Sequence, residues 1–201
     1  MTPPRGWRIV AAVAAVIAAM VLAILAVAGT DEAGIRVVIR ATARTSVVLF
    51  CAAFVASSAA RAWPGPTTRW LLANRRYVGV SFAVSHFVHL LAILALAGWS
   101  VSRMAADAGA TTGILGGVAY VFVAAMTATS FDRTAAWLGP RRWKQLHTIG
   151  AYYIWFVFFA SFVPRAFTSL VHVPFALLVI AALAVRLRHR VRAPVAAAVS
   201  A

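Results

Sequence analysis

The chain has 201 residues, of which 63% are hydrophobic and 11% charged. A water-soluble domain draws about a quarter of its residues from Asp, Glu, Lys and Arg, so this composition excludes a soluble globular protein and indicates a bilayer environment. The net charge of +15 comes from short basic clusters between apolar runs, which are typical of membrane-protein loops rather than of a nucleic-acid-binding surface.

Six apolar runs are long enough to cross the hydrocarbon core, which takes about 20 helical residues. They cover residues 9–29, 37–60, 77–99, 114–131, 147–163 and 170–187. The first run follows Arg5 and Arg8 like a signal peptide, but it exceeds the roughly 7–15 apolar residues of a cleaved one, so we expect a retained helix. Between the fourth and fifth runs, Gly139-Pro140 predicts the end of a short helix that Asp132 caps. The sequence therefore predicts one all-α domain over residues 1–201, an integral membrane six-helix bundle with a basic and then Ala-rich tail at 188–201.

The basic residues also predict an orientation. With a cytoplasmic N-terminus, 14 of the 19 Lys and Arg residues fall on the cytoplasmic side, as the positive-inside rule requires. We expect both termini in the cytoplasm and, for a bacterial-type cell, location in the inner membrane.

The composition also limits the chemistry. One cysteine, Cys51, lies within an apolar run, which excludes an intrachain disulfide and a Cys-ligated metal cluster. No Gly-rich nucleotide-binding loop is present, so a reductase built on this chain would take electrons from a separate donor.

The histidines are the main candidates for a buried site, because ionisable groups at membrane depth are costly and tend to mark function. His86 and His89 lie one helical turn apart in the third run, His147 opens the fifth, and His172 lies in the first turn of the sixth. Neutral imidazoles from facing helices are suited to hold a haem iron. The alternative is that each ring only hydrogen-bonds a nearby serine or backbone carbonyl. His189, among the arginines of the tail, is interpreted as a solvated or headgroup residue.

Several motifs around these histidines resemble the ferric-reductase-like transmembrane domain family, and in particular its small haem-binding membrane subunit that serves periplasmic methionine sulfoxide reductase. The resemblance covers about residues 35–187. Its motifs are Arg75-Arg76-Tyr77-Val78-Gly79 leading to His89, Thr129-Ser130, Leu138-Gly139-Pro140-Arg141-Arg142-Trp143-Lys144-Gln145-Leu146-His147, and Tyr152-Tyr153.

This resemblance implies a six-helix bundle that carries b-type haem and passes electrons across the membrane. Two-haem members carry one histidine pair on the third helix and another on the fifth. Here the second member of each pair is replaced, by Arg75 and by Ala160. The family's pairing therefore does not transfer directly, and the number of haems, one or two, stays open.

Depth estimates compare the remaining combinations. Counting about 1.5 Å per residue from the cytoplasmic edge, His86 lies at about 15 Å, His89 at about 19 Å, His147 at about 5 Å and His172 at about 21 Å. The mismatch disfavours a His86–His147 pair but leaves it open. We expect at least one haem between the third helix and the fifth or sixth, with His86, His89 and His147 as iron ligands and His172 as a further haem contact.

A basic stripe lies near the outer end of the second helix. Arg36, Arg40 and Arg44 repeat every four residues and so share one helix face. Arg40 and Arg44 are candidates to bind haem propionates or a quinone headgroup, because guanidinium matches carboxylate bidentately. The alternative, equally weighted, is that the stripe snorkels toward outer headgroups.

Together these observations favour a membrane b-type cytochrome. It would be the haem-binding electron-transfer component of an oxidoreductase, with a quinone or flavoprotein donor and an acceptor on the outer face. The rival hypothesis is a haem-free transporter or assembly subunit whose histidines serve proton or substrate traffic.

Overall fold

The computed structural model describes the backbone of residues 4–198 and the side chains of residues 4–188. The described chain is helical, with the elements α1 (Trp7–Ala28), α2 (Glu32–Ala62), α3 (Pro66–Leu96), α4 (Val101–Ala108), α5 (Ala110–Ala128), α6 (Asp132–Leu138), α7 (Pro140–Ala166), the 3-10 turn η1 (Leu170–His172) and α8 (Val173–Ala198). Within it, six helical segments are long and apolar enough to cross a membrane, which confirms the predicted all-α class and the number of candidate spans. The His189 side chain and the end of the predicted tail lie outside the described residues.

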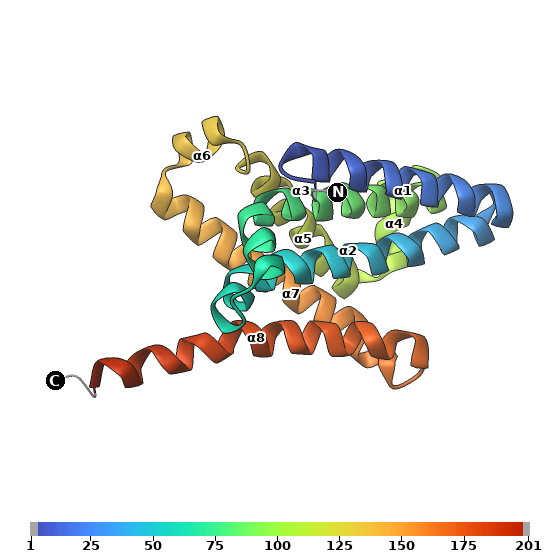
Figure 1. Cartoon of the computed structure of the whole chain (residues 1–201). Coiled ribbons are helices and arrows are strands. Elements are labelled where there is room, and N and C mark those ends of the chain that lie inside the picture. The colour runs from blue at the N-terminus through green and yellow to red at the C-terminus, as the bar shows by residue number, and fades with distance from the viewer. Residues whose placement is uncertain (1–3, 199–201) are drawn as a thin grey trace.

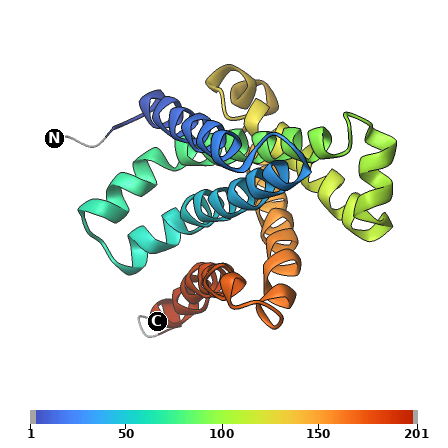
Figure 2. The same cartoon turned by 90° about the vertical axis from the view of Figure 1, so that its right-hand side faces the viewer.

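Five of the long helices form a closed ring. α2 packs against α3 and α8, α7 packs against α8 and α5, and α5 also contacts α3. α1 lies outside this ring, against α2 and α3 (Figure 1). Only Ile9 and Ile17 of α1 are buried, so α1 covers the ring without entering its interior. The view in Figure 2 shows α7 and α8 side by side, joined by the short turn that contains η1.

Two of the ring helices begin earlier than the apolar runs suggested. α3 starts at Pro66 and α7 at Pro140, each with proline in the first turn, where its missing N–H costs no hydrogen bond. Gly139, at φ 78°, separates α6 from α7, a backbone conformation that glycine adopts without strain. Arg75 and His147 therefore lie well inside helices and not in loops.

The predicted cap of the short helix was wrong in one respect. α6 follows Phe131, and no side chain caps its first turn. The Asp132 carboxylate instead accepts from Arg76 Nη2 at 2.7 Å, because an exposed carboxylate gains more from a guanidinium than from a neutral amide. The predicted end of the helix at Gly139 is confirmed.

Small hydroxyl residues line the contact between α2 and α3. Thr42, Ser46, Ser81 and Ser85 are fully buried. Ser46 Oγ donates to Ser85 Oγ at 2.9 Å, and Ser85 Oγ donates to the Thr42 carbonyl at 3.3 Å. Small polar residues let membrane helices approach closely while satisfying their own hydrogen bonds, so α2 and α3 form a tight hairpin that supports one side of the ring.

Candidate functional site

A cavity of about 600 Å³ lies inside the helix ring. We call it the central cavity. We call its buried lining residues the floor and its more exposed ones the mouth. The floor includes Phe50, Phe82, Ala83, Val123 and Ile154, and the mouth includes Arg75, Arg76, Lys144, Asp132 and Arg186. All five ring helices and α6 contribute to its lining. Cofactor sites typically measure about 300–1,000 Å³ and combine apolar walls with a few polar groups, so the central cavity has the size and lining of such a site.

The floor of the central cavity is apolar and aromatic. Phe50 packs against Phe82 with ring centroids 5.4 Å apart and against Phe158 at 5.3 Å. These three rings, with Val123 and Ile154, belong to the buried core. A planar apolar ligand would therefore meet aromatic surface and little water at this end of the cavity.

The mouth of the central cavity is cationic. Arg76 is neutralised by Asp132, 2.7 Å away. Arg186 donates to the Phe54 carbonyl at 2.6 Å, and its guanidinium lies over the Phe54 ring at 4.1 Å. Arg75 donates to Ser57 Oγ at 2.6 Å. Of the four cations at the mouth, Arg76 alone has a carboxylate partner within residues 4–188, so the mouth favours an anionic group.

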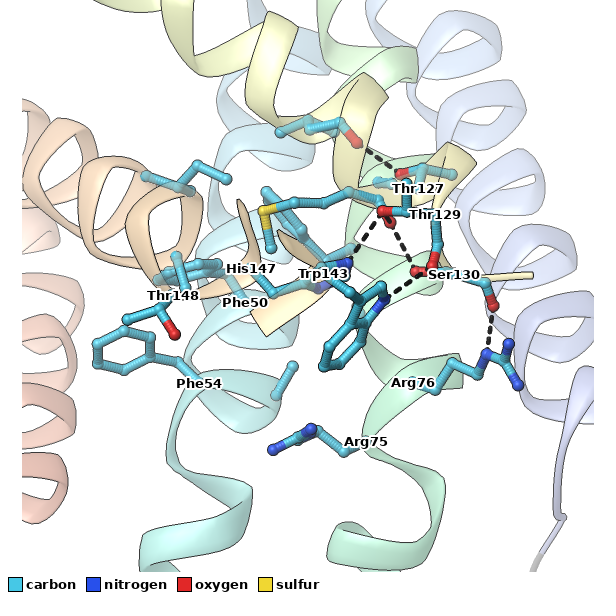
Figure 3. A pocket seen from close by; sticks show the side chains of 18 of the residues that line it. Phe50, Phe54, Arg75, Arg76, Thr127, Thr129, Ser130, Trp143, His147 and Thr148 are labelled. Atoms are coloured by element: carbon cyan, nitrogen blue, oxygen red, sulfur yellow. Dashed lines mark hydrogen bonds between the residues drawn. The ribbon is translucent and has the colours of Figure 1, made fainter. Parts of the chain in front are cut away.

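His147 is the histidine that lines the central cavity. Its ring stacks on Trp143, with centroids 4.1 Å apart, and its Nε2 lies 3.1 Å from Thr129 Oγ1 (Figure 3). The Thr129 hydroxyl donates to the Ala125 carbonyl at 2.8 Å. We therefore assign Nε2 as the donor to Thr129, which leaves Nδ1 with a free lone pair, since the bond made by one ring nitrogen decides which nitrogen can bind a metal.

His86 and His89 lie together on α3, away from the central cavity. Their rings stack with centroids 5.6 Å apart. His89 Nδ1 lies 3.1 Å from the Ile39 carbonyl and 3.1 Å from Thr42 Oγ1. Because carbonyls only accept, Nδ1 is the donor and Nε2 keeps its lone pair, the arrangement found in metal-binding histidines. His86 packs between aromatic rings, the nearest being Tyr120 at 4.7 Å.

His172 occupies a third place, at the end of η1. Its ring lies 6.2 Å from Phe162, which in turn lies 6.3 Å from Phe158, the neighbour of His86. The Nδ1 atoms of His86 and His172 are buried and have no hydrogen-bond partner among the described residues. Phe158 and Phe162 thus lie between these two histidines. Among the described residues, no three or more His, Cys, Asp or Glu side chains lie together as a possible metal site.

The arginine stripe is divided between two environments. Arg36 and Arg40 line a second cavity of about 720 Å³, together with Arg165 and Asp107. Arg36 also pairs with Glu32 at 2.7 Å. Arg44 lines neither cavity, and its guanidinium lies 5.7 Å from the Phe175 ring on α8. The two candidate cofactor-binding arginines, Arg40 and Arg44, therefore do not share a site with His147.

Several cavity residues were not singled out from the sequence as site residues. Thr129 and Trp143 stand in the motifs that carry the family resemblance, so their positions could have been weighed. Arg75 and Gly79 also stand in one of these motifs, and Arg75 replaces a histidine of the family's pairs. Arg186 gave no sequence signal, because its place in the cavity depends on how α8 is rotated.

No protein-family model, curated protein or solved structure matches the chain.

Proposed function

We propose that this protein is a membrane b-type cytochrome, similar to the ferric-reductase-like class, that relays electrons across the membrane and holds its haem in the central cavity. The observation that supports this most directly is the distribution of polarity in the cavity. An aromatic floor, a cationic mouth and one imidazole at its wall match an apolar macrocycle that carries carboxylates on one edge and iron at its centre.

The residues present fit this group in three respects. The volume of about 600 Å³ lies within the range of cofactor sites. Gly79 lines the cavity, and a Cβ added there would meet no atom within 4 Å, so α3 leaves open surface where a flat ligand could lie. His147 offers one ring nitrogen that Thr129 does not use.

Each group would have a separate task. When bound, haem supplies one-electron chemistry. His147 would hold the iron through its free ring nitrogen, and Thr129 and Trp143 would fix the orientation of the imidazole. Arg186 and Lys144 would pair with the propionates, because guanidinium and ammonium form strong charge-assisted hydrogen bonds to carboxylates. Phe50 and Phe82 would exclude water and so tune the potential through burial.

The proposal assigns one haem to the central cavity. His86, His89 and His172 line neither cavity, and Phe158 and Phe162 occupy the space between His86 and His172. We propose that these three histidines serve in aromatic packing, and that His89 is also anchored by hydrogen bonds to Ile39 and Thr42. They are the matched controls for His147.

The remaining parts of the proposal follow from the charge distribution. All four cations at the mouth belong to the set of 14 basic residues on one side of the membrane. The positive-inside rule then gives cytoplasmic termini, a cytoplasmic cavity mouth and insertion in the inner membrane of a bacterial-type cell. A separate quinone or flavoprotein would donate electrons, and the acceptor would lie on the outer face.

Haem content of the purified protein tests this proposal. We expect detergent-purified wild type to show a Soret band that His147→Ala lowers at least tenfold, as loss of the protein ligand to iron requires. His86→Ala, His89→Ala and His172→Ala should each retain haem. A wild type that stays colourless after haem is supplied would favour the haem-free alternative. If His147→Ala retains haem and another of these variants loses it, that other histidine holds the haem and the assignment to the central cavity is wrong.

A further inference from the structure

Arg75 and His147 occupy corresponding positions on two helices that enter the ring from the same end. On α3 the lining residues Arg75, Gly79 and Phe82 stand at i, i+4 and i+7, and on α7 His147 is followed by Ala151 and Ile154 at the same spacing. Residues at this spacing share one helix face. Arg75 on α3 and His147 on α7 therefore line the same cavity from two different helices.

Within residues 4–188, the central cavity is lined by no second imidazole. Its lining contains one histidine, His147. A guanidinium is always protonated and has no lone pair to give to a metal, so Arg75 would not be an iron ligand. Met126 also lines the cavity, but its sulfur packs over Gly150, where an added Cβ would lie 2.6 Å from Sδ.

Arg75 has hydrogen-bond donors available to a ligand in the central cavity. Its guanidinium is fixed by one hydrogen bond, to Ser57 Oγ at 2.6 Å, and has no carboxylate partner in the part of the chain that the structure describes. A guanidinium has five N–H donors, so most of its donors are uncommitted. Arg76, the next residue, differs because it is paired with both Asp132 and the Ser130 carbonyl.

We infer that the central cavity binds small inorganic anions, such as azide or nitrite, with His147 as the single protein ligand to iron and Arg75 as the donor of hydrogen bonds to the anion. This inference rests on the proposed function. Polarity and hydrogen-bond donors beside an open coordination position decide whether a haem protein binds exogenous ligands or only transfers electrons. The chain would then be a ligand-binding haem protein as well as an electron relay.

Azide titration of the ferric, haem-loaded protein tests the inference, with the shift of the Soret band as readout. We expect a saturable shift in wild type and binding about 10- to 100-fold weaker in Arg75→Gln, the effect of losing a hydrogen bond to a charged group. Arg69→Gln is the matched control: Arg69 is exposed on α3 and lines neither cavity, so this variant should bind azide within about threefold of wild type. Carbon monoxide, which is uncharged, should bind the ferrous forms of all three proteins alike.

The outcomes separate the two proposals. Absence of a Soret band refutes the proposed function itself. Haem that is present but gives no spectral change with azide or carbon monoxide overturns the inference, as does equal azide affinity in wild type and Arg75→Gln. If the ferrous wild type has a six-coordinate spectrum and Met126→Leu has a five-coordinate one, Met126 is a second iron ligand, and this result also overturns the inference. If Arg75→Gln fails to accumulate, Ser57→Ala removes the tether of Arg75, and unchanged azide binding in that variant counts against the inference.

Discussion

Replacing Gly79 by Leu should remove haem from the protein while leaving the helix bundle folded. Gly79 lines the central cavity, and a Cβ at this position would meet no atom within 4 Å. Leu adds four carbon atoms, which take up roughly 100 Å³ if each needs about the space of a water molecule. The cavity measures about 600 Å³, so the side chain would occupy the surface on which a flat macrocycle has to lie.

The same substitution should not lower the stability of the fold. Glycine in a helix interior is about 0.8–1 kcal/mol less favourable than alanine, and leucine is among the better helix formers. An added Cβ meets no atom within 4 Å and the rest of the side chain would extend into the cavity, so we expect little overpacking cost to oppose this gain. We expect an unchanged or slightly higher thermal midpoint in detergent, together with a haem-to-protein ratio below one tenth of the wild-type value.

The ratio of Soret absorbance to protein concentration measures the first quantity, and scanning fluorimetry measures the second. Gly117→Leu is the matched control: Gly117 lies on α5, an added Cβ there also meets no atom within 4 Å, and the residue does not line the cavity. Its haem content should equal that of wild type. Full haem content in Gly79→Leu would refute the placement of haem beside α3, and aggregation of this variant alone would refute the openness of the cavity wall.

Two further substitutions test the walls on the α7 side. Gly150→Ala should lower the thermal midpoint, because its Cβ would lie 2.6 Å from Met126 Sδ and 3.0 Å from the Phe122 ring. The overpacking cost of about 1–3 kcal/mol exceeds the helix-propensity gain of about 1 kcal/mol. A midpoint at or above that of wild type would contradict the close packing of α5 on α7. Thr129→Val keeps the size of the side chain but removes the acceptor of the His147 bond, so haem affinity measured by competition with apomyoglobin should fall about 10- to 100-fold, as for other residues that orient a metal ligand. An unchanged affinity would mean that Trp143 alone orients the imidazole.

The six membrane-spanning candidates could be predicted because length and hydropathy are local properties of the sequence. The starts of α3 and α7 do not follow from hydropathy, since the apolar runs begin inside these helices while Pro66 and Pro140 set their first turns. The cap by Asp132 was wrong because a carboxylate chooses among distant partners, and Arg76 is 56 positions away in the sequence.

The candidate site was less accessible to sequence reasoning. His86 and His89 were expected to share one helix face, and their rings do stack. What surrounds them depends on the rotation of α3 against α2 and α5, which hydropathy does not determine. The cavity around His147 brings together Phe50 of α2 and Arg186 of α8, and no local pattern connects residues so far apart. The haem assignment itself stays a prediction.

Arg186, at the mouth of the central cavity, lies close to the end of the last span. A ribosome that has synthesised five spans has therefore not yet supplied one of the four cations, nor the helix that closes the ring between α7 and α2. The complete pocket therefore forms only after α8 has been synthesised. If haem is held there as we propose, it should enter after α8 has packed between α7 and α2, and not while the earlier helices are being inserted.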